Sequence, residues 1–84
     1  MGKWDKLLDG ILRGRSDANI PFDDLCGLLL RLGFEQRTRG SHNTFRKPGV
    51  ADRPNLQRSG NNAKPYQVRQ VRDIILRYKL GDET

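Results

Sequence analysis

The sequence is poor in the residues that build disulfides, metal sites and membrane spans. Its 84 residues include one cysteine, Cys26, and one histidine, His42. One cysteine cannot close an internal disulfide, and one Cys with one His falls short of a zinc ligand set. We therefore expect no disulfide, no bound metal and no cofactor. No apolar run reaches the roughly 18 residues of a membrane-spanning helix, and no signal-peptide pattern is visible. We expect a cytoplasmic protein without a membrane partner.

Common enzyme motifs are also missing. The sequence has no Gly-rich phosphate loop followed by Lys and Ser or Thr, no Ser–His–Asp arrangement and no paired-carboxylate motif. Cys26 lies at the edge of an apolar helical stripe. At such a position a cysteine is usually a small buried or half-buried residue, and we do not expect it to act as a nucleophile.

Positive charge is what the chain has in excess. It contains 16 Lys and Arg against 10 Asp and Glu, a net charge of +6. Nine of the basic residues fall within residues 36–72, where Asp52 is the single acidic residue. Eleven of the 16 are arginines, whose guanidinium group suits bidentate contacts with phosphate. This clustering predicts a polyanionic partner, most often a nucleic acid. The alternative is that the block serves solubility alone.

Three segments carry apolar residues at helical spacing. They predict an amphipathic helix over residues 4–12, a second helix from Pro21 to Gly33, and a last helix from Pro65 to Gly81. Proline suits the first turn of a helix, and glycine suits the position just after its end. The arginines that we expect to point outward from the last helix are Arg69, Arg72 and Arg77.

Between the second and last helices the spacing changes to that of strands. Residues 34–39 and 42–47 predict two strands joined by a Gly-Ser turn, and residues 54–57 predict a weaker third strand. Residues 59–62 are rich in Gly, Asn and Ser and predict a loop.

The order of these elements predicts the fold class. A helix, three strands and a helix, in the order αβββα, are typical of an α+β domain in which a three-stranded antiparallel sheet carries two helices on one face. The opposite face of the sheet is then open. We divide the chain into an N-terminal helix and linker over residues 1–19 and one domain over residues 20–81. The sequence does not decide whether the first helix packs on this domain or serves a partner.

The second predicted strand presents the histidine. Side chains alternate across a strand, so if Phe45 points into the core, His42, Thr44 and Arg46 lie on the open face. Imidazole can take and give protons near neutral pH, which is what transfer of an RNA phosphodiester requires. Positive charge near the phosphate oxygens supports the same reaction. On this pattern alone, a surface histidine beside glycine is more often without a catalytic role.

Four segments resemble the HicA toxins of HicA–HicB toxin–antitoxin systems. The segments are IPFDDL at 20–25, RLGF at 31–34, GSHNTFR at 40–46 and AKPYQVRQVR at 63–72. The resemblance covers roughly residues 20–80. It implies a fold like that of double-stranded-RNA-binding domains. It also implies a ribosome-independent mRNA interferase that blocks translation until HicB neutralises it. The catalytic histidine of the family maps onto His42.

The chain departs from the family pattern in two places. The helix over residues 4–12 is additional to the shortest members. The third strand carries Asn55-Leu56-Gln57 where a basic, His-containing segment is commoner, so the chain offers no second imidazole.

The functional hypothesis that follows is metal-independent RNA cleavage with His42 as general base or general acid. We expect RNA to bind through seven residues: Arg37, Arg39, Ser41, Thr44, Arg46, Lys47 and Lys64. Strand alternation places Arg46, but not Lys47, on the His42 face. Tyr66 and Lys64 are candidates for a second proton-transfer group. An antitoxin resembling HicB would cover the His42 face.

Two other hypotheses remain open. The basic face could bind RNA without cleaving it, by contacts with shape and backbone. Alternatively, Arg69 and Arg72 on the last helix could contact duplex DNA or a protein partner.

Overall fold

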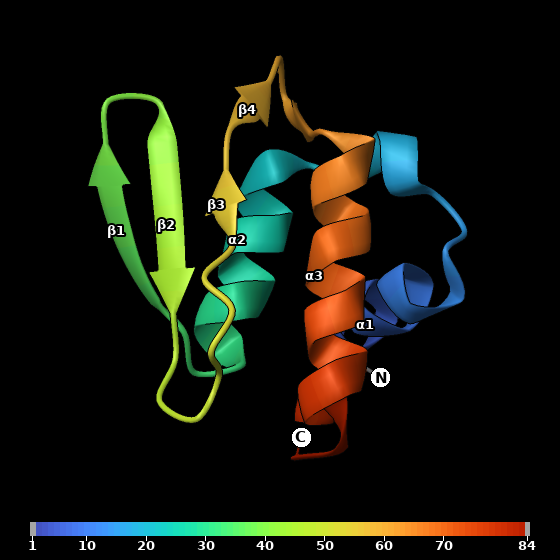
Figure 1. Cartoon of the computed structure of the whole chain (residues 1–84). Coiled ribbons are helices and arrows are strands. Elements are labelled where there is room, and N and C mark those ends of the chain that lie inside the picture. The colour runs from blue at the N-terminus through green and yellow to red at the C-terminus, as the bar shows by residue number, and fades with distance from the viewer. Residues whose placement is uncertain (1, 84) are drawn as a thin grey trace.

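The computed structural model describes residues 2–83 (Figure 1). The protein has an α+β fold, as predicted. Two N-terminal helices are followed by a three-stranded antiparallel sheet and a C-terminal helix that packs against them. The helices are α1 (Lys3–Arg13), α2 (Phe22–Arg31) and α3 (Pro65–Tyr78), with short 3-10 turns η1 (Asp17–Asn19) and η2 (Leu80–Glu83). Within residues 2–83, no helix has the length and apolar character needed to cross a bilayer.

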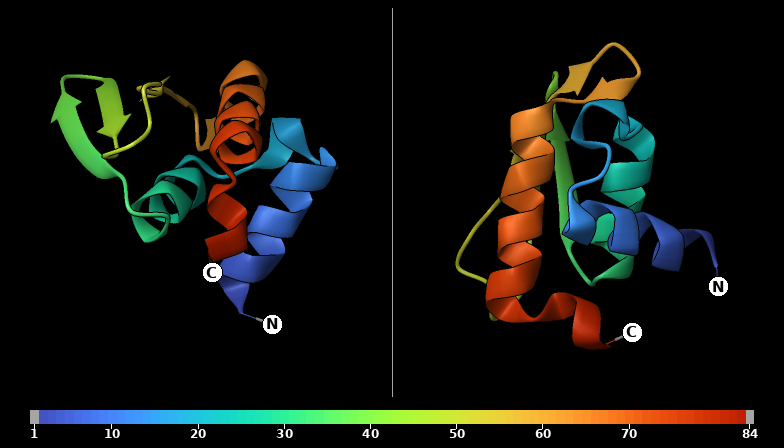
Figure 2. Two further views of the ribbon diagram at one scale, coloured as in Figure 1. Left: turned by 60° about the horizontal axis from the view of Figure 1, so that its bottom comes forward. Right: turned by 90° about the vertical axis from the view of Figure 1, so that its right-hand side faces the viewer.

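The main sheet has the order β1-β2-β3, so β2 is its central strand. Its strands are β1 (Glu35–Arg39), β2 (His42–Arg46) and β3 (Asn55–Leu56), and all pairs are antiparallel. Figure 2 shows the sheet over α2, with α3 beyond β3 and α1 on the side of the helices away from the sheet. The three predicted strands are therefore confirmed, the third shorter than expected.

The sequence prediction was wrong for residues 59–62. They are not a loop but part of a small hairpin, formed by β4 (Arg58–Ser59) and β5 (Asn62–Ala63). Its turn contains Gly60 at φ 62°, in the left-handed region that glycine adopts without strain. The hairpin is held against the start of α2, since the Phe22 N–H donates to the Asn61 carbonyl at 3.0 Å.

The predicted end of the last helix was also wrong. α3 ends at Tyr78, not at Gly81. Lys79 takes the left-handed conformation at φ 54°, and its N–H donates to the Ile75 carbonyl. This closes the helix without glycine. The predicted start at Pro65 is confirmed.

One hydrophobic core joins the sheet and all three long helices. The sheet contributes Phe45 and Leu56, both fully buried. The helices contribute a larger set, which includes Ile11, Leu25, Leu28, Leu29, Val68, Val71 and Ile75. Because Ile11 of α1 is fully buried, the first helix packs on the domain. The sequence did not decide whether this helix packs on the domain, and the structure shows that it does.

Arg72 differs from its predicted orientation. It does not point into solvent: only 17% of its side chain is exposed. Its Nε donates to the Ile11 carbonyl at 2.6 Å, and its Nη2 pairs with the Asp17 carboxylate. Arg72 therefore ties α3 to the end of α1 and to η1. Arg69 and Arg77 are exposed, and Arg77 pairs with Asp52.

Replacing Arg72 by methionine should destabilise the fold. The change removes two charge-assisted hydrogen bonds and leaves the half-buried Asp17 carboxylate unpaired. We expect a loss of about 2 kcal/mol in the free energy of unfolding, measured by urea denaturation. Arg69→Met is the matched control, because Arg69 is exposed on the same helix. Equal midpoints for the two variants would contradict this role.

Candidate active site on the outer face of the sheet

The sheet has an inner face on the core and an outer face in solvent. Phe45 is buried on the inner face, so His42, Thr44 and Arg46 lie on the outer face, as predicted. The strand register places Arg39 opposite His42, and Arg37 opposite Thr44. We use the name outer face for these residues with the others that share their side of the strands: Glu35, Arg37, Arg39, His42, Thr44, Arg46, Asn55 and Gln57.

His42 sits at the start of β2 and is exposed. The Gln57 amide nitrogen lies 3.1 Å from its Nδ1 and 3.4 Å from its Nε2. The Lys64 Nζ donates in turn to the Gln57 Oε1 at 3.4 Å. The imidazole of His42 on β2, the amide of Gln57 after β3 and the ammonium group of Lys64 before α3 are therefore neighbours in that order. Arg39 of β1 is opposite His42 in the strand register, while Lys64 is linked to His42 only through Gln57.

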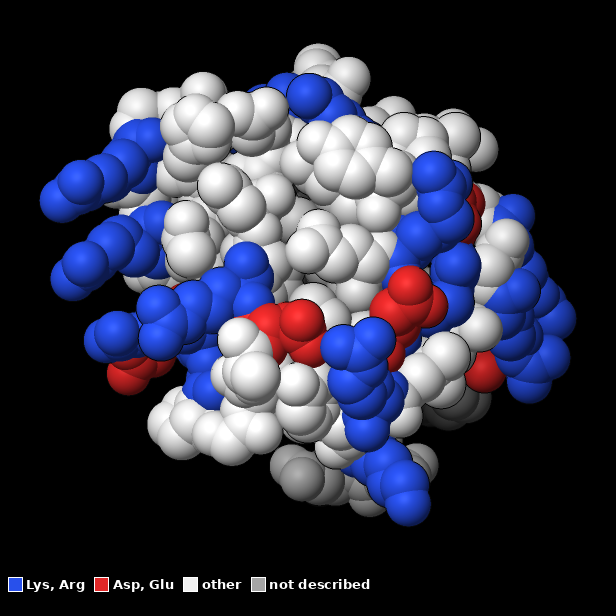
Figure 3. All heavy atoms as spheres, in the orientation of Figure 1, with Lys and Arg blue, Asp and Glu red and all other residues white. Residues whose placement is uncertain are grey.

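The arginines of the outer face are accessible to an anion. Arg37 and Arg39 have no ion-pair partner among the side chains of residues 2–81. Arg46 pairs with Glu35 at 3.3 Å, but both side chains are largely exposed. Such a pair contributes about 0–1 kcal/mol and can yield to a phosphate. In Figure 3, Lys and Arg side chains project from the side of the molecule where Figure 1 shows β1 and β2.

Arg53 is a candidate that the sequence analysis missed. Together with Arg37, Thr44 and Arg46 it lines a hollow of about 260 Å³. Its segment is tethered to α3, since the Tyr78 hydroxyl accepts from the Ala51 N–H at 3.3 Å. Arg53 precedes a proline outside any strand, so no alternation rule could assign it to a face. The run of basic residues was the signal that pointed to it.

Two of the seven predicted RNA-binding residues lie elsewhere. Lys47 is on the inner side, where its Nζ is 2.6 Å from the position that a Cβ on Gly33 would take. Ser41 lies in the turn between β1 and β2 and lines a groove under the β1–β2 hairpin. Arg37, Arg39, Thr44 and Arg46 are on the outer face, and Lys64 reaches it through Gln57. Tyr66 is exposed, but no contact joins it to His42 within the described chain.

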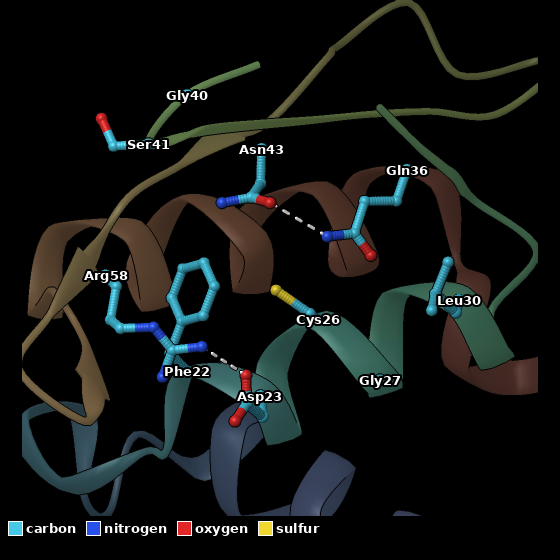
Figure 4. A pocket seen from close by; sticks show the side chains of 10 residues that line it. All are labelled: Phe22, Asp23, Cys26, Gly27, Leu30, Gln36, Gly40, Ser41, Asn43 and Arg58. Carbon is cyan, nitrogen blue, oxygen red and sulfur yellow. Dashed lines mark hydrogen bonds and ion pairs between the residues drawn. The ribbon is translucent and has the colours of Figure 1, made fainter. Parts of the chain in front are cut away.

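The groove under the β1–β2 hairpin has a volume of about 520 Å³. Figure 4 shows α2 as one wall and the residues of β1, β2 and their turn as the other. The Asn43 amide oxygen accepts from Gln36 at 3.1 Å and from Thr38 at 2.9 Å. These bonds cross-link the inner side of the hairpin. They hold β1 against β2 and so fix the positions of Arg39 and His42, which are paired on the outer face.

Cys26 lines the same groove and is buried, as predicted (Figure 4). Burial raises the pKa of its thiol to about 11, the negative charge of Asp23 adds to this, and Arg58 opposes it. Because the thiolate is the reactive form, the folded protein holds Cys26 in an unreactive state near neutral pH.

Cys26 should therefore alkylate slowly in the folded protein. At pH 8 the fraction of thiolate is about a hundredfold lower than for an unperturbed cysteine. We expect the iodoacetamide reaction to be slower by at least that factor in buffer than in urea. The native rate should rise with pH until about pH 11, where the thiol ionises. A native rate equal to the rate in urea would contradict the burial.

Comparison of the chain with protein-family models, with curated proteins and with solved structures finds no match. Among the side chains of residues 2–81 there is no group of three or more His, Cys, Asp and Glu placed to hold a metal ion.

Proposed function

We propose that this protein is a metal-independent endoribonuclease that acts through His42, as the resemblance to HicA toxins implies. The observation that supports this best is the row Arg39–His42–Gln57–Lys64 on the outer face. An exposed imidazole contacts one amide there, Lys64 binds the other end of that amide, and Arg39 is opposite His42 in the strand register. RNA cleavage without a metal needs a proton acceptor and positive charge at the phosphate, and this row supplies both.

The proposed reaction is an internal transfer of the phosphodiester. His42 accepts the proton of the ribose 2′-hydroxyl, and the 2′-oxygen forms a bond to phosphorus. The bond from phosphorus to the 5′-oxygen breaks, and the leaving oxygen takes a proton from water or from a second group of the protein. The products are a 2′,3′-cyclic phosphate and a 5′-hydroxyl. Arg39 and Lys64 neutralise the phosphate oxygens, while Arg37, Arg46 and Arg53 hold the neighbouring phosphates.

The resemblance also supports a role as the toxin of a toxin–antitoxin pair in the cytoplasm. The free protein would cleave mRNA and block translation. Its antitoxin, resembling HicB, would cover the outer face and exclude RNA. An acidic partner fits a surface that carries Arg37, Arg39, Arg46 and Arg53, because complementary charge speeds association.

Incubation of the purified protein with RNA in EDTA tests the proposal. We expect cleavage in EDTA and RNA binding that weakens with salt. Salt-sensitive binding with no cleavage would instead indicate a non-catalytic RNA-binding module. Preference for duplex DNA would indicate a role for the last helix, although the packing of Arg72 against Ile11 and Asp17 removes one of its two candidate contacts.

Arg39 offers a separate test of the RNA interface. We expect Arg39→Gln to weaken RNA binding and to lower the slope of log K against log salt concentration by about one. The matched control is Arg15→Gln, because Arg15 is exposed outside the outer face. Binding titrations at several salt concentrations provide the measurement. The same slope in both variants would show that Arg39 makes no phosphate contact.

A further inference from the structure

Three arginines from three segments line one hollow of about 260 Å³ on the outer face. Arg37 comes from β1, Arg46 from β2, and Arg53 from the segment before β3. Thr44 lies opposite Arg37 in the strand register and lines the same hollow. A guanidinium group donates in a planar fork that fits phosphate oxygens, and a hydroxyl can add one more donor. The donor groups of the hollow are therefore those of a phosphate site.

Arg53 is held in place although it lies outside any strand. On one side of it, the Asp52 carboxylate accepts from the Tyr78 hydroxyl at 3.1 Å, so Asp52 is turned toward α3. On the other side, the Pro54 carbonyl accepts from the Phe45 N–H at 2.9 Å, which ties the segment to β2. A residue before proline is extended, and consecutive side chains of an extended chain point to different sides. Arg53 therefore reaches the hollow from a backbone that is fixed at both neighbours.

The hollow lies a short distance along the sheet from His42. Thr44 is two residues beyond His42 on the same face, a separation of about 7 Å along the strand. This separation is comparable with the distance between successive phosphates of an extended RNA strand. An RNA whose scissile phosphate lies at His42 can therefore place the next phosphate in the hollow.

Glu35 brings a carboxylate to the same hollow. Its Oε2 lies 3.3 Å from the Arg46 Nε, and the two side chains are 70% and 61% exposed. An ion pair this exposed is weak, so a phosphate can replace the carboxylate at Arg46. Arg37 and Arg53 form no ion pair with any side chain between residues 2 and 81. Glu35 therefore opposes an anion in the hollow without blocking it.

We propose that the hollow is a subsite for the phosphate next to the scissile one, and that Arg53 selects RNA with at least two phosphates; this inference rests on the proposed function of His42. The subsite narrows the class of substrate. A dinucleotide with one internal phosphate fills the position at His42 alone. A strand with a further phosphate on the correct side fills both positions and binds more tightly.

Binding of short 2′-O-methyl dinucleotides tests the subsite, because they lack the 2′-hydroxyl that the proposed cleavage requires. Three probes are titrated into the full chain and followed by NMR. One carries the internal phosphate alone, one has an added 5′-phosphate, and one has an added 3′-phosphate. We expect the added phosphate at one of the two ends to lower the Kd about tenfold. Equal Kd values for all three probes would overturn the proposal.

Variants show whether this gain in affinity comes from the hollow. We expect Arg53→Gln to remove most of the gain, and Glu35→Gln to increase it, because the second change removes a negative charge beside the phosphate. Arg15→Gln removes a guanidinium group at an exposed position outside the outer face and should keep the gain. An equal loss in Arg15→Gln and Arg53→Gln, or a smaller gain in Glu35→Gln, would overturn the proposal. So would inorganic phosphate that binds with the same Kd as the two-phosphate probe, because the hollow would then be a site for free anions.

Cleavage of the corresponding ribodinucleotides separates the subsite from the proposed function. We expect kcat/KM to rise about tenfold with the same added phosphate that tightens binding. If that phosphate tightens binding but no ribodinucleotide is cut, the subsite stands and the proposed function fails. If all the ribodinucleotides are cut with equal kcat/KM and the probes bind equally, the subsite fails and the proposed function stands.

Discussion

Replacing His42 by alanine is expected to reduce RNA cleavage by a factor of about 10²–10⁴. This is the usual contribution of a positioned general acid or base. No other imidazole exists in the chain to take its place. The measurement is the single-turnover rate on a defined RNA, with protein in excess, so that changes in binding do not hide changes in chemistry.

The His42→Ala variant should keep its fold and its affinity for RNA. His42 is exposed, so the melting temperature should change little. The cationic residues remain, so the Kd for RNA should stay within a few-fold. Gln70→Ala, an exposed position on α3 outside the outer face, is the control for a small change at the surface. Equal cleavage by the original protein and by His42→Ala would remove His42 from the mechanism.

The second large effect is on stability. Phe45→Ala should destabilise the domain by about 3–5 kcal/mol, since it empties a fully buried aromatic site in a small core. A domain of this size is held by roughly 5–15 kcal/mol, so this change removes a large share of its stability. Urea denaturation at low temperature gives the value.

Arg46→Ala is the matched control for Phe45→Ala. The two residues are neighbours on β2 and point to opposite faces of the sheet. An exposed substitution of this kind usually changes stability by no more than about 0.5 kcal/mol. A similar loss in both variants would mean that the inner and outer faces are assigned wrongly, and with them the exposure of His42.

Local patterns were enough to predict most of the fold. The apolar spacing placed α1, α2 and α3, and a proline marked the start of α3. Alternation around Phe45 placed His42 on the exposed face. These features depend on residues that are close in sequence. The repeat of about 3.6 residues in a helix and of two residues in a strand determines which side chains face the core, and the prediction used the same repeats.

Features that depend on distant partners were not predicted. Arg72 binds Ile11 and Asp17, which precede it by 61 and 55 positions. Gln57 contacts His42, which precedes it by 15 positions. The β4 and β5 strands have two residues each, too few to show alternation. Lys79 ends its helix in a conformation for which glycine is the usual signal. Neither spacing nor composition reveals a tertiary contact, a two-residue strand or a left-handed lysine.

In the proposed function, His42 drives attack by the 2′-hydroxyl on the adjacent phosphate. The most direct measurement uses an RNA with one known cut site and the same RNA with a single 2′-deoxynucleotide at that site, both in EDTA. We predict that the first is cut to a 2′,3′-cyclic phosphate and a 5′-hydroxyl, and that the second is not cut there. Cleavage of the deoxy-substituted site, or a product with a 5′-phosphate, would contradict this mechanism.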